Sequence, residues 1–185
     1  MYNDDLSQEL FTWIKGHFFG KYRGTVTDNE DKSNRGRLKV RVPAVLGDVE
    51  AWAMPCVPYA GKKVGFYSLP EDGTGVWVEF EAGDPSYPIW SGCFWADNEL
   101  PDPGGAPIKI WKTEKLTVRI DDQHDELKLA TDSKSTVTLA KDIKSEKGNA
   151  KHTVSSSAVV SELSAGKVEV TSASVKVNNG AWEVT

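Results

Sequence analysis

The stretch Pro101-Asp102-Pro103-Gly104-Gly105-Ala106-Pro107 divides the sequence into two halves of different character. Three prolines and two glycines in seven residues exclude a regular helix or strand, so residues 102–107 are predicted to be a linker. Most aromatic residues precede this stretch. After it, from residue 108 to residue 185, Trp111 and Trp182 are the only aromatic side chains. We therefore expect two structural units, at residues 20–101 and 108–185.

The half after the linker consists of short alternations of apolar and polar residues, which is the pattern of β-strands. The first three alternations, LTVRI, ELKLA and TVTLA, begin ten residues apart and end at residue 140. Residues 141–157 are more polar, and the pattern leaves open whether strands continue through them. Alternation returns at residues 167–171, 174–178 and 182–185, with Asn178-Asn179-Gly180 as a hairpin turn.

One face of these strands collects the apolar side chains and is predicted to be the core of an assembly of several chains. Each strand offers only two or three such side chains, worth roughly 1.5–3 kcal/mol each when buried. That does not offset the ordering of about eight to ten residues at roughly 1–2 kcal/mol each. Copies arranged around a shared axis would bury this face, and its small side chains favour three copies. The alternative is a disordered or loosely paired tail. The predicted trimer core comprises Leu116, Val118, Ile120, Leu127, Leu129, Val137, Leu139, Val168, Val170, Val175 and Val177.

The half before the linker alternates short strands with polar turns. Five or six strands in about 75 residues are typical of a small barrel, and the five-stranded OB fold is the natural candidate. Leu38, Val40 and Val42 share one face of a strand, and Val76, Val78 and Phe80 share one face of another. The predicted strands cover residues 22–27, 36–43, 51–57, 63–68, 76–81 and 89–95. The fold class is therefore all-β.

An amphipathic helix is predicted before the barrel, at residues 5–19. Asp4 or Asp5 can cap its start and Gly20 can end it. Because fifteen residues make a marginal helix in isolation, its apolar face must pack on the barrel or dock onto a partner. Spacings of three and four place these side chains on that face: Leu6, Leu10, Trp13, Ile14 and Phe18.

The composition argues against several functions. The net charge of -5 lies entirely in the first 101 residues, and an acidic module lacks the electrostatic footprint of nucleic-acid binding. Cys56 and Cys93 are too few for a disulfide framework or a metal cluster and are interpreted as free, buried thiols. The first residues lack a signal-peptide pattern, and no apolar stretch reaches the roughly 18 residues that span a membrane. We expect synthesis in a cytoplasm and delivery without a signal peptide.

No catalytic constellation stands out, so no enzymatic activity, cofactor or metal site is predicted. Glu79 and Glu81 alternate with apolar residues and therefore lie on the solvated face of a strand. Cys93 has no histidine near it in the sequence, as a cysteine nucleophile would need. Gly73-Thr74-Gly75 precedes a strand rather than a helix, which indicates a hairpin loop and not a phosphate-binding loop.

Several short motifs follow one another through the barrel half, and their order and spacing are more specific than any one of them. They are YRGTVTDN at 22–29, GRLKVRVP at 36–43, AWAMP at 51–55, AG at 60–61, GFYSLPEDGTGVWVEFEAGDP at 65–85 and YPIWSG at 87–92. In these motifs the chain resembles the OB-fold domain of central spike proteins of contractile tails. That family comprises the baseplate spikes of phages and the valine-glycine repeat proteins of type VI secretion.

The resemblance implies a non-enzymatic structural spike in a phage tail or contractile injection particle, assembled in the bacterial cytoplasm. Three copies would cap the tube or hub, with residues 108–185 forming a trimeric β-helix or β-prism needle. Sheath contraction would drive the needle through the target cell envelope, so contact with that membrane would be transient. The family's larger members carry a hub portion before the barrel. Only about 20 residues precede it here, so the helix at residues 1–19 is expected to contact a separate hub protein.

The resemblance also bears on the end of the needle. Family needles end in a metal-bound tip built from a close histidine pair, or in a blunt face covered by a small conical (PAAR-like) tip protein. His17, His124 and His152 are far apart, so no intrinsic metal tip is expected. The blunt end that would contact a tip protein is Asn178, Asn179, Gly180, Ala181, Trp182, Glu183, Val184 and Thr185.

Two other functions are compatible with this sequence. The first is an OB-fold module that binds oligonucleotides or oligosaccharides and carries a flexible β tail. Its stacking platforms would be Trp52, Trp77, Trp90 and Trp95. The second is a phage fibre or depolymerase that binds glycans through its β tail.

Overall fold

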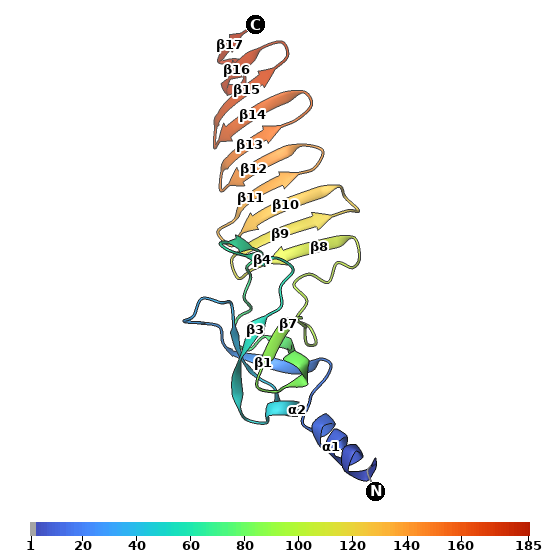
Figure 1. Ribbon diagram of the computed structural model, residues 1–185. Helices are drawn as coiled ribbons and strands as arrows, with labels where there is room; N and C mark the ends of the chain where they lie inside the picture. Colours follow the sequence, from blue (N-terminus) through green and yellow to red (C-terminus); the bar gives the residue numbers. More distant parts are fainter. Residues whose placement is uncertain (1–2) are drawn as a thin grey trace. The chain divides into compact units, whose positions relative to one another are not determined.

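The computed structural model describes residues 3–185, with side chains from Leu6 onward, and consists mainly of β-strands (Figure 1). It divides into two compact units, residues 1–99 and residues 100–185. The predicted all-β class with an N-terminal helix and a five-stranded barrel is confirmed. No helix in the described part of the chain is long and apolar enough to cross a membrane.

The helix α1 (Asn3–Lys15) ends four residues before the predicted boundary. Two contacts explain the early end. The ring of His17 donates from Nδ1 to the carbonyl oxygen of Trp13 at 2.6 Å and so takes one of the last helical acceptors. The N–H of Phe18 donates to the carbonyl oxygen of Gly83 at 2.7 Å, which commits the backbone of residue 18 to the barrel.

The first unit is a closed barrel of five strands in the order β1-β2-β3-β7-β6. All neighbours are antiparallel except β3 and β7, which are parallel. A small closed barrel of five strands is the OB fold. The strands are β1 (Tyr22–Asp28), β2 (Leu38–Arg41), β3 (Glu50–Pro55), β6 (Gly75–Phe80) and β7 (Pro88–Cys93).

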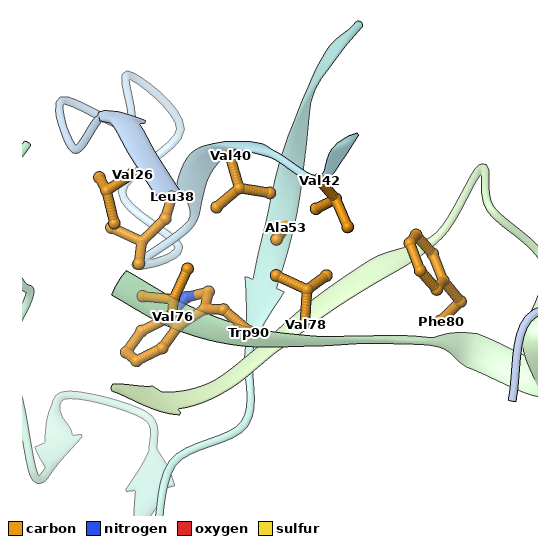
Figure 2. Close-up of a cluster of buried hydrophobic side chains, with 9 residues drawn as sticks. All are labelled: Val26, Leu38, Val40, Val42, Ala53, Val76, Val78, Phe80 and Trp90. Carbon is orange, nitrogen blue, oxygen red and sulfur yellow. The ribbon is translucent and has the colours of Figure 1, made fainter. Parts of the chain in front are cut away.

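The barrel core is formed by the inward residues of each strand, as Figure 2 shows. Along β6 the side chains alternate between buried and half-buried, which confirms the predicted inward face. Trp90 closes the core and donates from Nε1 to the carbonyl oxygen of Gly36 at 3.1 Å. The buried cluster is Val26, Leu38, Val40, Val42, Ala53, Val76, Val78, Phe80 and Trp90.

Short elements connect the barrel strands: α2 (Pro43–Leu46) and the 3-10 turn η1 (Glu81–Gly83). The strand predicted at residues 63–68 is wrong. Instead β4 (Ala60–Gly61) and β5 (Val64–Gly65) pair only with each other, as a separate hairpin. Gly65 lies against the backbone of Tyr59, where a Cβ atom would meet the carbonyl oxygen at 2.9 Å. This close backbone approach makes a tight hairpin rather than a barrel strand.

The second unit is one ten-stranded antiparallel sheet whose strands β8 to β17 follow one another in chain order (Figure 1). The strands are β8 (Ile108–Lys112), β9 (Leu116–Asp121), β10 (Glu126–Thr131), β11 (Ser135–Leu139), β12 (Ile143–Lys147), β13 (Ala150–Val154), β14 (Ala158–Leu163), β15 (Gly166–Thr171), β16 (Val175–Val177) and β17 (Trp182–Val184).

Two regions of this sheet extend what the pattern predicted. Residues 141–157, which the pattern left open, contribute the regular strands β12 and β13. The predicted hairpin turn at residues 178–180 is the 3-10 turn η2 (Asn178–Gly180), with positive φ at Asn178 and Asn179. A left-handed backbone at consecutive turn residues is what a tight hairpin requires.

Candidate interaction surfaces

One face of the ten-stranded sheet, here called the apolar face, carries all eleven residues predicted for the trimer core. Residues that pair directly across two antiparallel strands point to the same side of the sheet. Leu129 pairs with both Val118 and Val137, and Val168 pairs with Val177. Between β11 and β15 the directly paired residues on this face are Ser145, His152 and Ser161.

The apolar face has no cover within one copy of the chain. Among the described residues of this unit Asp121 is the only buried side chain, and every buried apolar residue belongs to the barrel. Large side chains such as Leu116, Leu163 and Trp182 are more than half exposed. An exposed surface that gathers so many apolar side chains on one side of a sheet marks an interaction site.

The opposite face of the sheet is polar and is already satisfied within one copy. Ion pairs join Lys151 to Glu146 at 3.3 Å, Lys167 to Glu169 at 2.8 Å and Lys176 to Glu183 at 3.1 Å. Glu162 also lies directly opposite both Lys151 and Lys167. The charged side chains partly bury one another, whereas no described residue covers the apolar side chains on the other face. Further burial is therefore needed only on the apolar face.

A second exposed apolar surface lies on α1. Leu6, Leu10, Trp13 and Ile14 are all about half exposed or more, and they share one side of the helix as predicted. At its end the Trp13 ring stacks on His17, with ring centroids 4.1 Å apart. This surface is referred to below as the α1 face.

Phe18 does not belong to the α1 face, contrary to the prediction. Because the helix has already ended, the Phe18 ring turns to the barrel and packs beside Tyr22 and Phe80. Phe19 lies against Gly83, where a Cβ atom would come within 2.9 Å of the ring. Residues 17–19 therefore fasten the helix to the barrel.

The predicted tip residues lie at the last edge of the sheet. β17 pairs on one side with β16 and has no second neighbour among the described strands, so its outer backbone groups are free for another strand. Trp182 and Val184 continue the apolar face, because they pair with Val177 and Val175. Both side chains are at least half exposed.

The four tryptophans predicted as stacking platforms differ in their surroundings. Trp90 is buried in the barrel core and is not available to a ligand. Trp77 is packed beside Phe94, and the Arg23 guanidinium covers both rings. Trp52 is covered by Arg37, whereas Trp95 is mostly exposed. These surroundings, and the regular sheet in place of a flexible tail, do not favour the OB-fold binding module.

The segment between β9 and β10 holds a buried carboxylate. Asp121 accepts hydrogen bonds from His124 Nδ1 at 3.0 Å and Arg119 Nη1 at 3.1 Å, and from the N–H groups of Gln123 and His124. The hydrogen bonds from His124 and Arg119 lower the pKa of Asp121 to about 2, against the opposing effect of desolvation. Arg119 Nε also donates to Asp102 at 2.9 Å, so the predicted linker is tied to the sheet from that residue on.

Sequence reasoning missed a cavity of about 470 Å³ beside the β4–β5 hairpin. Its walls include Val57, Tyr59, Phe66, Leu69 and Trp90. A barrel strand at residues 63–68, as the pattern predicts, would leave no separate hairpin to line this cavity. The two cysteines also differ from expectation: both are free but exposed, because Cys56 and Cys93 stand at strand ends rather than inside the barrel.

A comparison with known families matches residues 22–95, which span the whole barrel, to the type VI secretion system/phage-baseplate injector OB domain. A comparison with curated proteins gives no match.

Proposed function

We propose that this chain is a structural central spike, because residues 22–95 match the injector OB domain of type VI secretion systems and phage baseplates. As a homotrimer it caps the tube or hub of a contractile injection system or phage tail. On sheath contraction it pierces the target cell envelope. Its role is mechanical rather than catalytic, and it works within the assembled particle.

The observation that carries this proposal is the apolar face of the sheet. A ten-stranded sheet without one buried apolar residue among its described side chains has no core of its own. Three copies arranged around an axis supply that core, because each sheet buries its apolar face against the other two and leaves its charged face in water. A long intertwined assembly of this kind has the stiffness that a piercing needle needs.

Partners follow from the two ends of the chain. The α1 face is the contact to a separate hub protein, in the manner of an amphipathic helix that docks into a groove. The free edge of β17, together with Trp182 and Val184, is the contact to a small conical, PAAR-like tip protein. Contact with the target membrane is transient, and no nucleic acid takes part.

The solution mass of the full chain tests the assembly. Light scattering should give three times the chain mass of 20.3 kDa, and the species should resist detergent. A particle of one chain mass would contradict the trimer and with it the spike.

Two neighbouring valines provide a matched pair of variants. Val159 lies on the apolar face opposite Val170, whereas Val160 lies on the polar face opposite Glu169. Val159→Lys places three unpaired ammonium groups in the trimer core and should reduce the mass to that of one chain. Val160→Lys gains an opposite charge and should stay trimeric. Trimers from both variants would show that the apolar face is not the interface.

A further inference from the structure

A single row of ten residues, one from each strand, runs along the middle of the apolar face. Each member pairs directly with the next. The row is aromatic at both ends and aliphatic over most of its length, but it is interrupted by three consecutive polar residues. In order, the row is Trp111, Val118, Leu129, Val137, Ser145, His152, Ser161, Val168, Val177 and Trp182.

The polar interruption is compact, and its neighbours on this face are apolar except for Lys147, which lies opposite Ala150. His152 stands between Ser145 and Ser161, and its Nδ1 lies 2.8 Å from the Ser161 hydroxyl. The same face carries Val154 and Val159 on one side of the three residues, and Ala150 and Leu163 on the other. Burying polar groups in such a setting is costly unless something bonds to them.

In the proposed trimer, the middle row of each sheet faces the shared axis. His152 of each copy then lies at the same height, so three imidazoles converge on one point. Ser161 holds one ring nitrogen of each imidazole, and the tautomer that donates from Nδ1 leaves the Nε2 lone pair free. A hydrogen bond at one nitrogen that orients the other is the usual arrangement around a metal-binding histidine.

We propose that the three His152 side chains bind one divalent transition-metal ion of the zinc class through Nε2. The site rests on the proposed trimer, because it is complete only when three copies contribute. Three imidazoles and a water molecule make a tetrahedral set that suits zinc. Ser145, which pairs directly with His152, offers a hydroxyl on the same face to bond that water. The ion gives a partner to the three Nε2 atoms, because Nδ1 is already bonded to Ser161.

The distribution of carboxylates on the sheet favours a metal held by neutral nitrogen ligands. All carboxylates within the ten strands lie on the polar face, because Glu146, Glu162 and Glu169 belong to the opposite register positions. The apolar face therefore offers no oxygen anion that would select magnesium or calcium, and imidazole nitrogen is its one strong donor near the axis. The site lies on the sixth of the ten strands, away from the chain's last strand.

Metal titration of the full chain tests the site. After treatment with a chelator and confirmation of the trimer by light scattering, the protein should take up about one Zn²⁺ or Co²⁺ per three chains. Co²⁺ should develop the visible absorption of a four-coordinate nitrogen site, and Zn²⁺ should raise the temperature of dissociation. His152→Gln should abolish uptake. His124→Gln is the control, because that histidine lies in the β9–β10 turn beside Asp121 and not on the apolar face.

Ser161→Ala provides a second variant in case His152→Gln does not assemble. It removes the hydrogen bond that orients the ring and should weaken binding about 10–100-fold while the trimer remains. A trimer that takes up no metal at this ratio, or one whose uptake survives His152→Gln, overturns the metal site and leaves the spike intact. A single-chain species overturns both. If chloride stabilises the trimer at acidic pH and no metal is taken up, the three imidazoles are protonated and bind an anion. This outcome likewise overturns the proposal.

Discussion

Among single residues, two glycines show how backbone conformation and packing each restrict a position. Gly83 has a φ of +83°. A Cβ atom at this position would lie 2.9 Å from the Phe19 ring. Gly73 has a similar φ of +87° but nothing within 4 Å of that position. The two glycines therefore share the backbone requirement and differ only in packing.

The pair Gly73→Ala and Gly83→Ala separates these two effects. Gly73→Ala should lower the free energy of unfolding by about 1–2 kcal/mol, the cost of a left-handed backbone for a residue with a Cβ. Gly83→Ala should cost more, because Phe19 must also move. Urea unfolding of both variants measures the difference. Equal costs would mean that the Phe19 contact does not help to hold α1 to the barrel.

Asp121 makes the sheet sensitive to acid. Its pKa is about 2 in the folded protein and 3.8 in its ordinary state, so the folded protein binds fewer protons than the unfolded chain between these values. The stabilising contribution is therefore complete above pH 3.8 and is lost as the pH falls toward 2. Asp121→Asn should be less stable at neutral pH and lose less stability over this acid range.

Circular dichroism during acid titration measures this effect. Asp125→Asn is the control, because Asp125 lies in the same turn but is exposed. An unchanged acid profile in Asp121→Asn would show that the network of Arg119, Asp121 and His124 does not contribute to stability.

Among the elements, α1 is a helix whose α1 face has no apolar partner among the described residues. Leu10→Glu combined with Ile14→Glu should abolish copurification with a hub protein, since two carboxylates would enter the docking groove. The barrel should keep its near-ultraviolet circular dichroism, because neither residue belongs to its core. Gln8→Glu with Thr12→Glu, on the opposite side of the helix, should leave copurification unchanged. Hub binding that survives the first variant would remove this role from the helix.

The polar face of the sheet explains why its strands pair in one register. Lys167 and Glu169 are two residues apart on the same face and carry opposite charges. If β14 and β15 slipped by two residues, Glu162 would lie opposite Glu169 instead of Lys167. A slip of two residues keeps the apolar face apolar, so the charges are what penalise it.

At the scale of the whole molecule, the two units obtain their cores in different ways. The barrel buries its apolar residues within one copy, whereas the sheet leaves its apolar face exposed. A chain cut after Glu99 should therefore remain folded and monomeric, whereas the full chain should be trimeric under the proposed function. Light scattering and near-ultraviolet circular dichroism of the shortened chain measure this. A trimeric barrel would show that the sheet does not drive assembly.

Much of this architecture could be predicted from the sequence because alternation along a strand is a local property. Side chains of successive residues point to opposite sides, so the pattern alone assigned Val76, Val78 and Phe80 to the barrel core. The same reasoning placed the eleven apolar residues of the sheet on one face. The hairpin turn at residues 178–180 and the match of the barrel motifs to an injector domain also needed nothing but the order of residues.

The remaining features depend on contacts between segments that are far apart in the sequence. The hydrogen bond from Phe18 to Gly83 ended the helix early. The pairing of β4 with β5 kept residues 64–65, part of the strand predicted at 63–68, out of the barrel. Residues 143–154 became strands because their neighbours in the sheet satisfy their backbone groups, although their own pattern is weak. The row that joins His152 to Ser161 likewise exists only through strand register, which a local pattern does not encode.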